Sequence, residues 1–373
     1  MKILMLLTKA YIRDPRVAKE ATSLVSSGNE VTVLEWSRHE DNPLPIETID
    51  GVKIVRLKNT KMMNIMRSAL FQNPLWWSIA TKKALELHSE TPFDIVHAHD
   101  LDTLSIGVRF KKSTGAKLIY DAHEIFSYMI SDDYTFLLPR IAQSLEDRWI
   151  KNIDGLIVAG ENYIPFYSDR TDAPIAQVLN CPKKQNNTFS IKDSTPFTVS
   201  YIGVLHKVRL FPDAVHALGN LEGVRFEIAA KKEGCYDAVE SASSKYDNVD
   251  FLGPIPYHEV MSRTSKADAI LCMFNPTSLL HKVCSPNKLY DSMAAGIPGI
   301  FSKETHCGTF ADQYGVGISV DFSPDILRET VMSLKEDSSL CEKLGRNGHK
   351  LANEIYNWEK QAENLIDLYH SIS

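Results

Sequence analysis

The stretch SPNKLYDSMAAGIPG, residues 285–299, opens with residue types that suit an anion site at the start of a helix. Ser285 is a favoured N-cap residue, and Pro286 fits the first helical position, where its missing N–H costs nothing. The amides of Asn287 and Lys288 would then point outward. The helix dipole, these amide donors and the lysine charge together favour phosphate. We therefore predict a phosphate site at this helix mouth.

Farther along the same segment, Asp291 places a carboxylate among apolar neighbours, where it could accept hydrogen bonds from both hydroxyls of a ribose. Small residues follow, and Gly296 is the expected end of the helix before Pro298. A capped helix with one solvated aspartate and ordinary close packing would show the same features. On these residues alone, both interpretations stay open.

A second group of candidates follows a strand expected within residues 197–205. Gly203 comes at the end of that strand, and Lys207 and Arg209 precede a helix expected to begin at Asp213. Two cations in a strand-to-helix loop suit a diphosphate, although such side chains are also commonly just solvated.

The loop after the strand expected at residues 249–255 carries apolar side chains that could form a wall for a flat base: Pro254, Ile255 and Tyr257.

Histidines and acids end two predicted strands of the first half. His97, His99, Asp100 and Asp102 have the alternation that can ligate a metal, because alternate residues of a strand share a face. A zinc hydrolase would need further ligands at later strand ends, and no comparable cluster follows in the sequence. We therefore expect no metal, and keep a metal hydrolase using the first three of these residues as a lesser alternative.

The composition limits the class of protein. With 373 residues, 44% of them hydrophobic, the chain should form two domains, and its net charge of −6 argues against a general nucleic-acid binder. Its six cysteines form no CxxC pair, which favours a reducing compartment. We find neither a signal peptide nor eighteen consecutive apolar residues, so we expect a cytoplasmic protein, soluble or peripheral at the inner face of a membrane.

The elements that must position these residues follow from alternating apolar runs and helical stretches. Strands are expected near residues 2–7, 30–36, 52–57, 94–99, 117–123 and 155–160, and again near 197–205, 224–230, 249–255, 269–274 and 296–301. Between them, residues 180–196 are polar and lack periodicity. This pattern predicts two α/β domains with doubly wound parallel sheets, whose ligands would bind beyond the carboxyl ends of the strands, in a cleft between the domains.

Several segments resemble retaining glycosyltransferases of family four, also called glycosyl transferases group 1. They are GVLHKVRLFPDAVHAL, VDFLGPIPYHEVMSRTSKADAILCMF, SPNKLYDSMAAGIPGI and GRNGHKLANEIYNWEKQAENLIDLY. The opening DPRVAKEATSLVSSGNEVTVLEW is similar to that family's first βαβ unit, so the resemblance covers nearly the whole chain in the expected order.

The resemblance implies a GT-B architecture, with two Rossmann-like doubly wound domains facing a cleft. It implies an acceptor-side domain at residues 1–182, a linker at 183–196, a nucleotide-sugar-binding domain at 197–356, and a terminal helix at 357–373 that crosses back to the first domain.

The resemblance also assigns roles to residues. It implies donor contacts from Gly203, Ile255, Pro256, Ser285, Pro286, Asn287, Lys288, Leu289 and Asp291. It implies catalytic roles for His123, Lys207 and Arg209. We expect acceptor contacts from Arg13, His99, Asp100 and Glu124.

The chain departs from the family's pattern at three positions. Asp291 stands where the family carries its second glutamate, and Val283 replaces the first, which usually contacts the donor sugar. Val204 replaces an arginine after the strand glycine, and Lys207 is the residue that would compensate.

By this resemblance the protein is a glycosyltransferase that moves a sugar from a UDP-sugar, UDP-glucose or a UDP-N-acetylhexosamine, to an acceptor hydroxyl with retention. No cofactor is required, and the acceptor would be a polysaccharide, a lipid-linked sugar or a small molecule. A non-catalytic nucleotide-sugar binding protein is the alternative. Residues 51–90 mix seven Lys and Arg with apolar side chains, which indicates either a helix packed on its own domain or a peripheral membrane contact.

Overall fold

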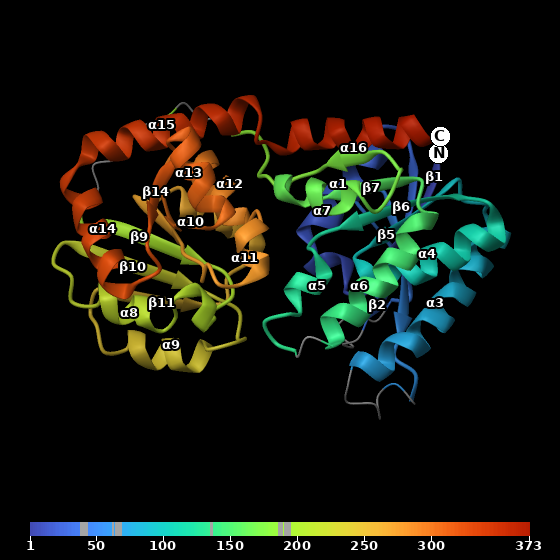
Figure 1. The fold of residues 1–373 in the computed structure, drawn as a ribbon, viewed down its shortest axis with the longest axis horizontal. Coiled ribbons are helices and arrows are strands. Elements are labelled where there is room, and N and C mark those ends of the chain that lie inside the picture. Colours follow the sequence, from blue (N-terminus) through green and yellow to red (C-terminus); the bar gives the residue numbers. More distant parts are fainter. Residues whose placement is uncertain (38–43, 62, 64–68, 135–136, 186–188, 190–194) are drawn as a thin grey trace. The chain divides into compact units, whose positions relative to one another are not determined.

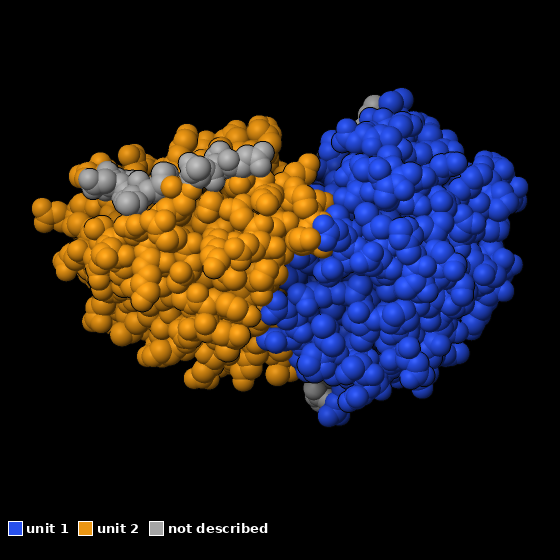
Figure 2. All heavy atoms as spheres, turned by 90° about the horizontal axis from the view of Figure 1, so that it is seen from above, with its two compact units in different colours: residues 1–179, 361–373 blue, residues 180–360 orange. Residues whose placement is uncertain are grey.

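The chain folds into two compact α/β units. The structure is a computed structural model that describes residues 1–37, 44–61, 63, 69–134, 137–185, 189 and 195–373. Unit 1 comprises residues 1–179 together with 361–373, and unit 2 comprises residues 180–360 (Figure 2). Each unit has its own sheet, flanked by helices (Figure 1).

The sheet of unit 1 has the strand order β3-β4-β2-β1-β5-β6-β7-β8. Its strands are β1 (Lys2–Leu7), β2 (Glu30–Ser37), β3 (Ile46–Ile49), β4 (Val52–Lys58), β5 (Ile95–His99), β6 (Lys117–Ala122), β7 (Gly155–Val158) and β8 (Ile175–Gln177). All neighbours pair in parallel except β3, which is antiparallel to β4. The order reverses between β1 and β5, and such a switch point is where open α/β sheets bind ligands.

The helices of unit 1 follow the predicted alternation. They are η1 (Tyr11–Arg13), α1 (Pro15–Ser26), α3 (Ala69–Glu90), α4 (Leu101–Thr114), α5 (Phe126–Met129), α6 (Leu137–Trp149), η2 (Ile150–Asn152), η3 (Glu161–Tyr163), α7 (Ile164–Ser168) and most of α16 (Trp358–Ile372). Helix α1 begins at Pro15, a favoured first helical residue, and the Asp14 carboxylate caps it by accepting from the amides of Arg16 and Val17.

Helix α3 packs on its own unit. Trp76 is buried and stacks on Trp36 of β2, with ring centroids 5.1 Å apart. Ala80, Ala84 and Leu87 continue the buried face at helical spacing. This packing favours the first of the two interpretations of the segment 51–90, within which residues 62 and 64–68 lie outside the described part of the chain. Among the described residues, no helix combines the length and the apolar character that crossing a bilayer requires.

The sheet of unit 2 has the order β11-β10-β9-β12-β13-β14, and all its strands are parallel. The strands are β9 (Phe197–Ile202), β10 (Val224–Ala229), β11 (Val249–Gly253), β12 (Ala269–Cys272), β13 (Gly299–Ser302) and β14 (Gly317–Val320). The order reverses between β9 and β12. The core of this unit contains Val199, Phe211, Phe226 and Leu271.

The helices of unit 2 connect these strands in the same alternating way. They are η4 (Lys207–Arg209), α8 (Asp213–Leu218), α9 (Tyr236–Ser243), η5 (Tyr257–Glu259), α10 (Val260–Thr264), α11 (Leu279–Val283), α12 (Asn287–Ala295), α13 (His306–Tyr314), α14 (Pro324–Glu336) and α15 (Ser338–Glu354). Two doubly wound sheets of Rossmann type are therefore present, as the sequence predicted.

Candidate functional site

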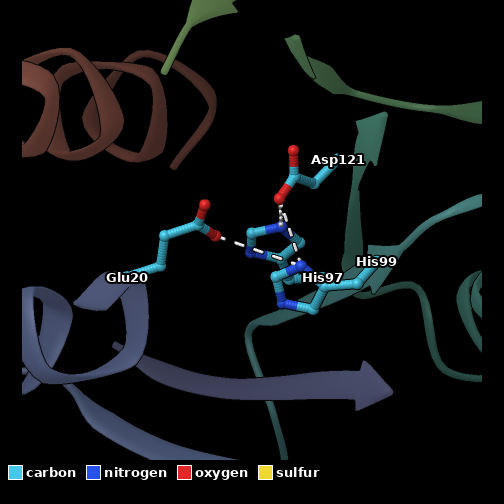
Figure 3. Close-up of side chains that lie close together, drawn as sticks. All are labelled: Glu20, His97, His99 and Asp121. Carbon is cyan, nitrogen blue, oxygen red and sulfur yellow. Dashed lines mark hydrogen bonds and ion pairs between the residues drawn. The ribbon is translucent and has the colours of Figure 1, made fainter. Parts of the chain in front are cut away.

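A buried polar cluster lies at the switch point of unit 1. Glu20 comes from α1, His97 and His99 from β5, and Asp121 from β6, and their side chains point toward one another (Figure 3). All four are essentially inaccessible to solvent. His97 and His99 point to the same face of the sheet because alternate residues of a strand share a face. The parallel register of β5 with β6 sets His99 beside Asp121.

Arg16 neutralises this cluster from the first turn of α1. Its guanidinium lies 2.9 Å from Asp121 Oδ1 and 3.0 Å from Glu20 Oε1, and it also donates to the carbonyl of Val178 at 2.6 Å. The arginine is itself buried. Arg16 and Glu20 lie four residues apart, so both project from the same face of the helix.

The two carboxyl groups of the cluster differ in protonation. Burial raises the pKa of Glu20, the neighbouring Asp121 charge raises it further, and the attraction of Arg16 leaves it at about 8. Burial alone would also raise the pKa of Asp121, but Arg16 and His123 outweigh it and hold that pKa well below its ordinary value. At neutral pH, Asp121 is thus ionised and Glu20 is mostly protonated.

His123 links the cluster to the surface. It follows β6, is 13% exposed, and places Nε2 2.9 Å from Asp121 Oδ2 and Nδ1 3.3 Å from Asp100 Oδ2. Burial lowers the pKa of His123, but the Asp100 and Asp121 carboxylates outweigh it and raise the pKa to about 9. At neutral pH the ring is therefore a cation with a carboxylate on each nitrogen, and it is not a base.

The two histidines of β5 are neutral. Burial lowers the pKa of His97, and burial with the neighbouring His97 lowers the pKa of His99 to about 3. His97 Nδ1 lies 2.7 Å from the hydroxyl of Tyr369 on α16, and the His97 and His99 rings stack with centroids 4.1 Å apart. Both rings serve as buried hydrogen-bonding groups.

The cluster corrects one step of the sequence argument. We discounted a metal because no later strand end supplied ligands, yet Asp121 of β6 and Glu20 of α1 join His97 and His99, with one ligand atom from each within 4.8 Å of the others. His99 Nδ1 lies 3.1 Å from Asp121 Oδ2 and 4.0 Å from Glu20 Oε2, and His97 Nε2 lies 3.8 Å from Asp121 Oδ2. Two ligand atoms of a tetrahedral zinc site are about 3.3 Å apart, so these distances fall on both sides of that value.

The charges nevertheless disfavour a cation there. Arg16 already lies against both carboxyl groups, and Asp121 Oδ2 already faces the His123 cation. A divalent ion would meet two existing positive charges in a buried site, where repulsion is strong. We therefore interpret the cluster as a self-neutralised hydrogen-bonding network.

A basic group occupies the switch point of unit 2. Lys288 of α12 is only 8% exposed, and its Nζ lies 4.5 Å from the ring centroid of Tyr201 in β9. Gly203 leaves room for it, because a Cβ at that position would lie 2.7 Å from Lys288 Nζ. The lysine charge is thereby held at the carboxyl end of β9.

Arg209 and Asp291 lie near the same edge of the sheet. Burial would raise the pKa of the Cys272 thiol at the end of β12, but a hydrogen bond with Cys307 and the charges of Lys288 and Arg209 lower it, while Asp291 acts in the opposite direction. Three charged groups from two segments, Arg209 of η4 with Lys288 and Asp291 of α12, thus act on one strand end. Arg209 also donates to the Val204 carbonyl at 3.4 Å.

The remaining donor-side candidates are placed around this edge. Burial and the Asp291 charge raise the pKa of Tyr257, which places this carboxylate near the loop that carries Ile255 and Pro256. Ile255 is half-buried and Pro256 is exposed. Lys207 is exposed on η4, so its side chain is less constrained than that of Lys288.

The predicted start of α12 is wrong by one residue. Pro286 is the N-cap, with φ −68° and ψ 146°, and the helix begins at Asn287, so Ser285 does not cap it. A proline at this place has an extended ψ, which the residue before a helix requires. Leu289 is buried, and Gly296 ends the helix in a left-handed conformation, as predicted.

Other acceptor-side candidates are less central. Arg13 is exposed at the end of η1, whereas Arg16, which the sequence did not single out, enters the buried cluster. Glu124 accepts a hydrogen bond from Tyr163. The spacing of Arg16 and Glu20 on the apolar-facing side of α1 was the one available signal for these two residues.

Comparisons with known proteins agree with this architecture. A profile of Glycosyltransferase Family 4 matches residues 16–162, and a profile described as Glycosyl transferase-like matches residues 209–367. No curated protein matches the sequence. The chain is a GT-B glycosyltransferase and belongs to these families, with the family 4 domain in its first half and the glycosyl transferase-like domain in its second.

Solved structures share the fold at low sequence identity. Sucrose-phosphate synthase of Thermosynechococcus elongatus superposes with a TM-score of 0.80 at 15% identity, covering 100% of this chain and 99% of that one. HepE of Anabaena, in complex with UDP and glucose, gives 0.71 at 12% identity and 100% of both chains. An E. coli structure described as trehalose-6-phosphate bound with UDP-2-fluoro glucose gives 0.69 at 11% identity and 99% of both chains.

Proposed function

We propose that the protein is a retaining glycosyltransferase that moves a sugar from a UDP-sugar, UDP-glucose or a UDP-N-acetylhexosamine, to an acceptor hydroxyl. The observation that carries the donor assignment is that two cations lie at the ends of the neighbouring strands β9 and β12. Lys288 Nζ lies 4.5 Å from the ring centroid of Tyr201 in β9, and Arg209 Cζ lies 5.3 Å from that of Phe274, just after β12. Asp291 is on the same helix as Lys288. Two cations suit the diphosphate, and the carboxylate suits the ribose hydroxyls. The uridine nucleotides bound to HepE and to the E. coli structure support uracil as the donor's base, and therefore a UDP-sugar.

The proposed reaction exchanges one bond for another at the anomeric carbon. The bond to the diphosphate oxygen breaks as the bond to the acceptor oxygen forms on the same face, and the departing phosphate oxygen takes the acceptor proton. Arg209, Lys288 and the first amides of α12 stabilise the charge that grows on the leaving group. One such preorganised contact contributes about 3 kcal/mol, or about a hundredfold in rate.

His123 enters this proposal as a cation, because its pKa of about 9 keeps it protonated at neutral pH. It therefore acts through hydrogen-bond donation and charge rather than by removing a proton. With Arg209, Lys207 and Lys288 on the diphosphate, the proposal requires no divalent ion. The acceptor, in polysaccharide or glycolipid synthesis, would bind unit 1 through Asp100, Arg13 and Glu124. The expected contact from His99 is wrong, because that side chain is buried in the network behind them.

The test substitutes the two diphosphate cations. Arg209→Ala and Lys288→Ala should each lower release of UDP from UDP-glucose about a hundredfold, while the thermal unfolding midpoint stays close to that of the wild type. Lys245→Ala is the matched control, because Lys245 is exposed after α9. If both variants keep the wild-type rate, the diphosphate assignment is wrong.

One observation favours a second candidate, a non-catalytic nucleotide-sugar binding protein. Val283, at the end of α11, replaces the glutamate that the family resemblance assigns to the donor sugar. Calorimetry that detects UDP-glucose binding, without hydrolysis or transfer over a panel of acceptors, would support this candidate.

A further inference from the structure

Asp100 has a backbone conformation that an aspartate rarely adopts. Its φ is 63° and its ψ is 165°, in a region where glycine is nearly the only residue found without strain. Strain of this kind persists only where surrounding contacts enforce it, and it gathers at functional sites. We therefore looked for the side-chain contact of Asp100 that this conformation serves.

The side chain does not cap the helix that follows. Asp100 occupies the N-cap position of α4, where an aspartate usually accepts from the first amides of the helix, yet its side chain makes no such bond. Aspartate is a favoured N-cap residue, but Asp100 does not make the capping hydrogen bond. Helix stability thus does not explain an aspartate at this position.

Backbone contacts lock the residue in place. The Asp100 amide donates to the Asp121 carbonyl at 2.9 Å, and the Thr103 amide donates to the Asp100 carbonyl at 3.2 Å. These bonds tie Asp100 to β6 on one side and to α4 on the other. As a result, its carboxylate is directed to His123, with Oδ2 3.3 Å from Nδ1.

Accessibility separates Asp100 from the other acids of the network. Its side chain is 30% exposed, whereas that of Asp121, on the opposite nitrogen of His123, is completely buried. Asp121, which is held by Arg16, therefore contacts His123 on its buried side, and Asp100 contacts it on its exposed side. Because Asp100 follows β5 beside β1, its carboxylate lies at the switch point of unit 1.

We propose that Asp100 is the residue that holds the reacting hydroxyl of the acceptor, with His123, Asp121 and Arg16 as positioning residues behind it. This inference rests on the proposed glycosyltransferase function. The Asp100 carboxylate accepts a hydrogen bond from the hydroxyl, and the proton itself still passes to the departing phosphate oxygen. A neutral sugar, which offers several hydroxyl donors, matches this carboxylate as the acceptor unit.

The experiment compares Asp100→Asn and Asp100→Gly with the wild type. Asparagine keeps the shape and removes the charge, and glycine removes the side chain and accepts the backbone conformation without strain. Asp172→Asn is the matched control, because Asp172 is an exposed aspartate of the same unit. The probes are an array of immobilised neutral mono- and oligosaccharides for the acceptor and UDP-glucose calorimetry for the donor.

We expect the wild type and the control to be retained by a neutral sugar on the array. Both Asp100 variants should lose at least about tenfold in this retention while their affinity for UDP-glucose stays within about twofold. Asp100→Asn should also lower the pKa of His123 measured by NMR titration, because it removes one of the two carboxylates that raise it.

Two results would overturn the inference. They are retention of Asp100→Asn equal to that of the wild type, and a wild type that retains no neutral sugar. Failure of the proposed function gives a different result, because the wild type would then neither bind nor turn over UDP-glucose, while the array still reports on Asp100.

Discussion

Glu20→Gln should change how the stability of unit 1 depends on pH. Glu20 is inaccessible to solvent and its pKa is raised from 4.5 to about 8, first by burial and then by Asp121. The folded protein therefore holds a proton on Glu20 that the unfolded chain releases between these two pH values. Stability from this group is complete below about pH 4.5 and is lost as the pH rises through 8.

The size of the effect follows from the shift. One retained proton gives a slope of about 1.4 kcal/mol per pH unit, and the full interval of about 3.5 units sets an upper limit of about 5 kcal/mol. Glutamine resembles the protonated carboxyl and does not titrate. The free energy of unfolding of the variant minus that of the wild type should rise with pH across this interval and level off above about pH 8.

Urea unfolding followed by tryptophan fluorescence is a suitable assay, because four of the five tryptophans lie in unit 1. Glu90→Gln, at the exposed end of α3, is the matched control and should run parallel to the wild type at every pH. A difference between Glu20→Gln and the wild type that stays constant, or that falls with pH, would refute the assignment of a protonated Glu20.

Two further substitutions test the buried charges and the donor edge. Arg16→Met should lower the free energy of unfolding of unit 1 by about 3–5 kcal/mol, because it removes one of the two cations that face the buried Asp121 carboxylate. Exposed Arg148→Met is the control, and a loss below about 1 kcal/mol would contradict the assigned role. Gly203→Ala should weaken UDP-glucose binding in calorimetry about tenfold, because its Cβ would lie 2.7 Å from Lys288 Nζ, and should also lower the unfolding temperature, because a side chain is strained at the φ of 156°; unaltered affinity would show that Lys288 does not contact the donor.

The sequence predicted the fold well because its signals are local. Apolar runs separated by helical stretches indicated parallel sheets, and the pair Asp14 and Pro15 marked the start of α1 at the correct residue. The start of α12 was displaced by one residue because Ser-Pro satisfies the rules for either Ser285 or Pro286 as the cap, and only backbone torsions distinguish them.

The buried network was only partly predictable. His99, Asp100 and His123 were visible because they end strands, where chemistry in such folds is expected. Glu20 and Arg16 were not, since charged side chains on a helix are normally solvated, and only the packing of α1 reveals that they are buried. The strained backbone of Asp100 leaves no trace in the sequence, because it arises from hydrogen bonds to β6 and Thr103.

The final helix has a consequence for how the polypeptide is made. Leu365, Leu368 and Tyr369 of α16 are buried in unit 1, and the Tyr369 hydroxyl lies 2.7 Å from His97 Nδ1. The two ends of the chain are side by side (Figure 1), with the Ser373 hydroxyl 2.9 Å from the Met1 sulfur. During translation, the first 179 residues emerge long before these partners exist. The nascent chain therefore has an uncovered apolar strip, and its His97 imidazole lacks the Tyr369 hydroxyl, until α16 has left the ribosome.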